Sequence, residues 1–98
     1  MITIHIEPVQ EAKQASRLVQ SAVRAEIAKL ELAVEMARKR LVPFEQKYGV
    51  TSDRFAAAMT AEDLDGGDDE YVCWAGEYKL LQRLQAKLTQ LKAIRYVD

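Results

Sequence analysis

Residues 27–48, IAKLELAVEMARKRLVPFEQKY, decide the fold. Their apolar side chains recur at alternating spacings of three and four residues, which places them along one face of an α-helix. The members of this first seam are Ile27, Leu30, Val34, Ala37, Leu41, Phe44 and Tyr48. Proline removes one backbone hydrogen bond from a helix, so we expect a kink near Pro43. The pattern predicts one long helix over residues 9–48.

A second apolar seam lies toward the other end of the chain. Its members are Trp74, Tyr78, Leu81, Leu84, Leu88 and Leu91. Asp68 is a good N-cap residue, and the two acidic residues that follow it favour the positive end of a helix dipole. The sequence therefore predicts a second long helix over residues 68–95.

A connecting segment joins the two predicted helices. Gly49 is typical of the residue after a helix end, and Thr51 or Ser52 can cap a short helix over residues 52–59. Residues 60–67 read as an acidic, glycine-containing loop, in which Thr60 and Asp63 form a capping pair for a single turn. We expect residues 1–98 to form a single helical domain.

The first eight residues show a different periodicity. Ile2, Ile4 and Ile6 alternate with polar residues, and Pro8 ends the pattern, which indicates a short strand or arm over residues 1–8. A lone strand leaves its backbone groups unpaired. We therefore expect this strand to pair with another chain, or not to form.

These elements predict an all-α fold: an antiparallel hairpin of two long helices joined by a short helix and an acidic loop. Two helices share little core, so we expect neither seam to be fully buried within one chain. Dimerisation or higher homo-oligomerisation would then complete a helical bundle. The candidate oligomer seam consists of Ile27, Leu30, Val34, Leu41, Leu81, Leu84, Leu88 and Leu91.

The composition excludes several classes of protein. Of the 98 residues 49% are hydrophobic and 30% charged, with only four Gly and two Pro, which argues against disordered chains and most all-β folds. No stretch approaches the roughly 18 apolar residues of a membrane span. A single cysteine allows no intramolecular disulfide, so we expect a cytoplasmic protein with no membrane partner.

The charge is uneven along the chain. The net charge is −1, yet residues 51–70 carry seven acidic side chains and one basic one. Arg38, Lys39 and Arg40 could contact phosphates, but no recognition motif accompanies them. Nucleic-acid binding is therefore a less favoured alternative.

Few residues offer chemistry. His5 is the only histidine and reads as a polar strand residue, while Cys73, between Val72 and Trp74, suggests a half-buried thiol. The acidic run before Trp74 lacks the spacing of a calcium-binding loop. We expect neither an enzyme nor a bound cofactor or metal.

Six aromatic residues gather around the connection between the helices: Phe44, Tyr48, Phe55, Tyr71, Trp74 and Tyr78. One interpretation is a local core that holds the short helix against both long ones. The other is an anchor for a partner protein, and the two are compatible.

The same region contains Lys47-Tyr48-Gly49, Thr51-Ser52 with Phe55, and Asp68-Asp69-Glu70 before Trp74. In this layout the chain resembles, over about residues 25–95, a family of small helical antitoxin-like proteins of cyanobacteria and archaea. This resemblance implies a non-catalytic protein that neutralises a small toxin, for example a ribonuclease, by covering a basic surface. The candidate partner interface consists of Ile2, Ile4, Ile6, Phe44, Tyr48, Phe55, Asp68, Asp69, Trp74 and Tyr78. The alternative function is a structural coiled-coil oligomerisation module.

Overall fold

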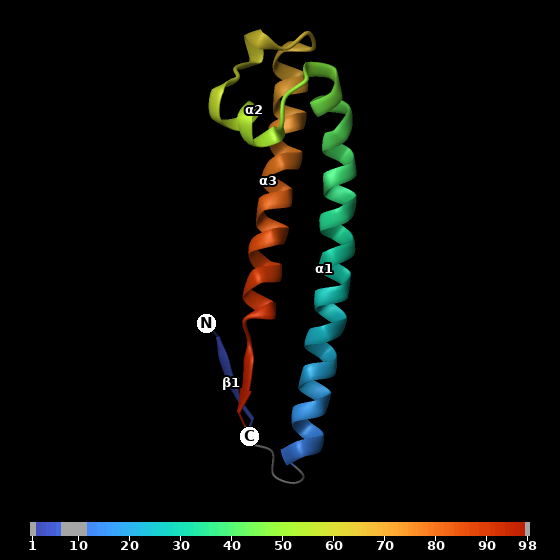
Figure 1. Ribbon diagram of the computed structural model, residues 1–98, viewed down its shortest axis with the longest axis vertical. Helices are drawn as coiled ribbons and strands as arrows, with labels where there is room; N and C mark the ends of the chain where they lie inside the picture. Colours follow the sequence, from blue (N-terminus) through green and yellow to red (C-terminus); the bar gives the residue numbers. More distant parts are fainter. Residues whose placement is uncertain (1, 7–11, 98) are drawn as a thin grey trace. The chain divides into compact units, whose positions relative to one another are not determined.

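A computed structural model describes residues 2–6 and 12–97, and it confirms the all-α hairpin (Figure 1). The elements in chain order are β1 (Thr3–His5), α1 (Ala12–Tyr48), α2 (Ser52–Ala58), the 3₁₀ turn η1 (Ala61–Asp63), α3 (Gly67–Lys92) and β2 (Arg95–Val97). The chain divides into two compact units. Unit 1 contains Met1–Ala33 and Leu84–Asp98, and unit 2 contains Val34–Arg83. Within each unit a segment of α1 and a segment of α3 run antiparallel.

In unit 2, α1 passes through Pro43 and ends at Tyr48. The proline lies on the exposed side of the helix, whereas Ala37 and Leu41 of the first seam are buried. Gly49 follows with a φ of 66°, and its N–H donates to the carbonyl of Glu45 at 2.8 Å. Glycine adopts this left-handed conformation without steric penalty, so its position explains the end of α1.

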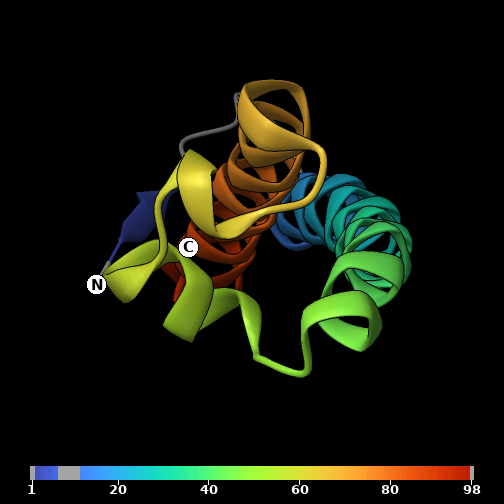
Figure 2. The same ribbon diagram turned by 90° about the horizontal axis from the view of Figure 1, so that it is seen from above.

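The connection in unit 2 crosses from the end of α1 to the start of α3 (Figure 2). The hydroxyl oxygen of Thr51 accepts a hydrogen bond from the N–H of Arg54 and caps α2. The expected turn at Thr60 also forms, because the Asp63 carboxylate accepts from the Thr60 N–H at 2.8 Å. These caps hold two short helical pieces that are too short to persist alone.

The start of α3 differs from the prediction by one residue. The helix begins at Gly67, so Asp68 lies in the first turn and is not the N-cap. The reason is that the carboxylate of Glu70 reaches back and accepts from the N–H of Gly66 at 2.8 Å. Gly67 itself has a φ of 61°.

In unit 1, one expectation about the N-terminal strand and one about the end of α3 are wrong. β1 pairs within the chain, parallel to β2, with Ile4 opposite Tyr96; the N–H of Arg95 donates to the carbonyl of Ile2 at 2.9 Å. Accordingly α3 ends at Lys92 and does not continue to residue 95. The β-branched and aromatic residues after Lys92 favour a strand once a partner strand is available.

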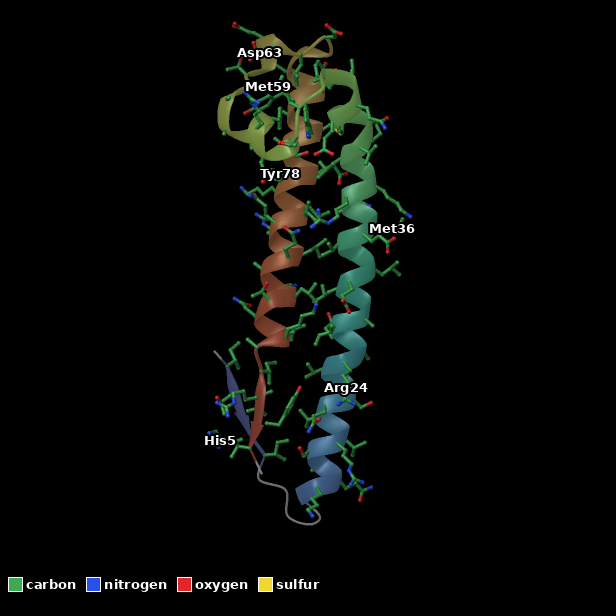
Figure 3. All side chains as sticks on the ribbon, in the orientation of Figure 1. His5, Arg24, Met36, Met59, Asp63 and Tyr78 are labelled. Atoms are coloured by element: carbon green, nitrogen blue, oxygen red, sulfur yellow. The ribbon has the colours of Figure 1, made fainter. Side chains whose placement is uncertain are left out.

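The two seams are partly covered within the chain, and neither is fully buried, as expected. Leu30, Leu41 and Leu81 are buried. The other members of the candidate oligomer seam are half-buried: Ile27, Val34, Leu84, Leu88 and Leu91. Large apolar side chains instead remain exposed on another face of α1, and in unit 2 Met36 points away from α3 (Figure 3).

Candidate functional site

Trp74 lies at the centre of an aromatic core in unit 2. Its ring stacks on Phe55 of α2, with centroids 3.9 Å apart and planes within 5°. Phe44 and Tyr48 of α1 stack on the same indole at 5.5 and 5.6 Å. Trp74 and Phe55 have no exposed surface, so neither can contact a partner unless unit 2 opens. The aromatic residues therefore hold α2 against α1 and α3.

A buried polar pair accompanies the aromatic core. The indole Nε1 of Trp74 donates to the hydroxyl of Ser52 at 2.9 Å. Both the hydroxyl and the backbone N–H of Ser52 donate to a carboxylate oxygen of Glu45, each at 2.9 Å. Sequence reasoning missed Ser52 and Glu45 as partners, because a spacing of seven residues across a helix end gives no periodic signal.

Tyr78 of α3 forms a second contact between α3 and α2. Its hydroxyl donates to the carboxylate of Asp53, and Figure 3 shows the side chain at the level of α2. This hydrogen bond, with partial burial, raises the pKa of Tyr78. The hydroxyl of Tyr78 is thus already engaged within unit 2.

Glu70 and Lys47 form an ion pair between α3 and the last turn of α1. The Lys47 ammonium donates to both carboxylate oxygens at 3.1 Å, and the hydrogen bond raises its pKa. Partial burial of Glu70 opposes its ionisation, but hydrogen bonds from Lys47, Tyr48 and the Gly66 N–H outweigh that effect and lower its pKa. Glu70 is therefore a structural carboxylate.

Four other carboxylates of residues 60–70 are exposed, and we call this set the acidic surface. It consists of Glu62, Asp65, Asp68 and Asp69. Within the described part of the chain, no ion pair joins these four side chains to a lysine or arginine. Asp65 is placed by its backbone, whose N–H donates to the hydroxyl of Tyr48 at 2.9 Å. The negative charge of Asp65 is thus carried on a backbone that a hydrogen bond to Tyr48 holds in place.

The structure divides the predicted partner interface. Of its five aromatic members, all in unit 2, two are buried, Phe55 and Trp74, and three are half-buried, Phe44, Tyr48 and Tyr78. Asp68 and Asp69 are exposed. Ile2, Ile4 and Ile6 belong to unit 1, where Ile2 is exposed and the other two are half-buried. β1 was expected to pair with another chain because it lacked a partner, and this reason does not hold, because β2 pairs with it.

His5 and Cys73 are the two residues whose side chains have potential for chemistry. His5 is exposed on β1. Cys73 is a free, exposed thiol and not half-buried as expected, because the buried side of α3 belongs to Trp74. Among residues 2–6 and 12–97, no group of three His, Cys, Asp or Glu side chains is placed to hold a metal ion.

A shallow groove of about 270 Å³ opens in unit 1 between α1, the end of α3 and β2. Its apolar lining is Val23, Ile27, Leu91, Ile94 and Tyr96, and its polar lining is Gln20, Arg24 and Lys92. The groove could accept one apolar side chain, and its two basic residues favour an acidic neighbour of that side chain.

None of the described helices contains an apolar stretch long enough to cross a membrane. No family model matches the chain, and no curated protein or solved structure shows significant similarity to it.

Proposed function

We propose that this protein is a non-catalytic interaction module, antitoxin-like in function, that binds a small basic protein through its acidic surface. The observation that carries the proposal is the set of four exposed carboxylates, which no described cation neutralises. A surface of one charge attracts a partner of opposite charge and speeds its association. The positively charged RNA-binding face of a ribonuclease toxin is a partner of this kind.

The backbone beneath the acidic surface supports this role. Asp68 and Asp69 lie in the first turn of α3, which is anchored one turn later by the stacking of Trp74 on three rings. A surface held by a packed core loses little conformational entropy on binding. Neutralisation would then be steric and electrostatic, by covering the toxin's active surface.

The test is a pull-down from extract of the protein's own host with the tagged full chain at moderate salt. The proposal expects one small basic protein in stoichiometric yield, lost when Asp68→Lys and Asp69→Lys are combined. The matched control combines Glu26→Lys and Glu35→Lys, which reverse two exposed carboxylates of α1 and should leave the yield unchanged.

Co-expression supplies the functional readout. The captured protein, expressed alone, should arrest growth, and co-expression of the wild-type chain should restore it. Equal rescue by the doubly reversed Asp68 and Asp69 variant would show that the acidic surface is not the contact. A captured protein that is harmless when expressed alone would refute neutralisation.

A further inference from the structure

A stripe of small and apolar side chains runs along α1 within unit 1, on the side away from the buried Leu30. It consists of Leu18, Ser21, Ala25, Ala28 and Leu32, all exposed and spaced alternately by three and four residues. Leu18 and Leu32 have 65% and 60% of their surface exposed. We call this set the outer stripe. Its spacing is that of a helix-pairing seam, yet within the described residues it has no cover.

We propose that the outer stripe binds the outer stripe of a second copy of this chain, antiparallel, around a two-fold axis that passes between Ala25 and Ala28. In this register Ala25 faces Ala28 of the second copy, and Leu32 faces its Ser21. Small residues at the centre let the two helices approach closely, and Leu32 of each copy covers Ser21 of the other.

The charges beside the outer stripe select a second copy and fix its direction. Arg24 and Glu31 are exposed on the same edge of the stripe, one heptad apart. Antiparallel pairing brings Arg24 of each copy against Glu31 of the other, so the contact forms twice. Parallel pairing would instead bring Arg24 toward Lys29 of the second copy, which is repulsive.

The proposal is independent of the partner at the acidic surface, because the two surfaces share no residue. It uses a different surface from the oligomer seam expected from the sequence, of which Leu30, Leu41 and Leu81 are buried within the chain. Only about four helical turns contribute, so the dimer should be weak and reversible.

Charge-swapped variants of the full chain test the pairing by sedimentation equilibrium at low ionic strength. Arg24→Glu leaves two carboxylates on this edge, and Glu31→Arg leaves two guanidinium groups. Each variant alone should dimerise on the order of tenfold more weakly than the wild type. An equimolar mixture should regain wild-type affinity as a heterodimer, because both cross-contacts then join opposite charges.

Two controls make the result specific. Glu26→Arg makes the same charge change at an exposed position on another side of α1 and should leave the dimer unchanged. Circular dichroism must show intact helix for Glu31→Arg, since Glu31 also pairs with Lys92 at 3.5 Å. A wild-type chain that stays monomeric at roughly 1 mM would overturn the proposal. So would a mixture that associates no better than its components.

Discussion

Replacing Ser52 with alanine tests whether the buried polar pair in unit 2 stabilises the fold. Ser52 is buried, and its hydroxyl accepts from the Trp74 indole while donating to Glu45. The substitution removes one small group and opens little space. Its main effect is to leave the Nε1–H of Trp74 buried without an acceptor.

A buried donor without a partner costs about 1–3 kcal/mol. The backbone N–H of Ser52 still donates to Glu45, so the carboxylate keeps one partner. For a domain of this size each kcal/mol corresponds to about 4–8 °C in Tm. The expected fall in Tm is therefore between about 4 and 24 °C, with the helix content of the folded state unchanged.

The assay is urea unfolding followed by circular dichroism at about 222 nm, in a double-mutant cycle with Trp74→Phe. Phenylalanine has no indole N–H that could be left without an acceptor. In the Trp74→Phe background, Ser52→Ala should therefore lower the free energy of unfolding by about 1 kcal/mol less than in the wild type, or by a still smaller amount. Thr89→Ala removes an exposed hydroxyl from α3 and should change stability by less than about 0.5 kcal/mol. An equal cost of Ser52→Ala in both backgrounds would refute the reasoning, since the indole contact would then contribute nothing.

Three further changes probe other features. Gly49→Ala should lower the free energy of unfolding by about 1–2 kcal/mol in urea titrations, because a side chain is strained at a φ of 66°. The pKa of Glu70 is lowered in the folded chain, so ionised Glu70 stabilises the fold above its unfolded pKa, and this stabilisation is lost as the pH falls through the folded-state pKa. Glu70→Gln should therefore flatten the dependence of Tm on pH below about 4.5. Arg95→Pro removes the N–H that donates to Ile2, so the amide of Ile6 should lose hydrogen-exchange protection while amides of unit 2 keep theirs.

The long helices were predictable because their periodicity is local. The spacing from Ile27 to Tyr48 predicts one continuous face, and Ala37 and Leu41 on that face are buried. The end of α3 was not predictable in the same way. Residues after Lys92 continue the apolar spacing of the helix, and only pairing with β1, more than 90 residues earlier in the chain, selects a strand.

The candidate site was predictable in composition but not in role. The aromatic residues are together, as their positions around the connection predict. Trp74, however, stacks on Phe44 and Phe55 and is fully buried. Sequence alone cannot assign that burial, because a core and an anchor require the same residue types. The outer stripe is hard to recognise in the sequence, because alanine and serine give a weak apolar signal beside the leucines of the buried seam.

The position of Trp74 also makes the protein carry its own optical probe. It is the only tryptophan in the chain, it is fully buried, and Tyr48 stacks on it at 5.6 Å. Its emission should therefore be blue-shifted, sensitised by energy transfer from the neighbouring tyrosine, and shifted to the red only when the aromatic core opens. Fluorescence thus reports on unit 2 alone, without a label, and can follow that unit while a partner binds.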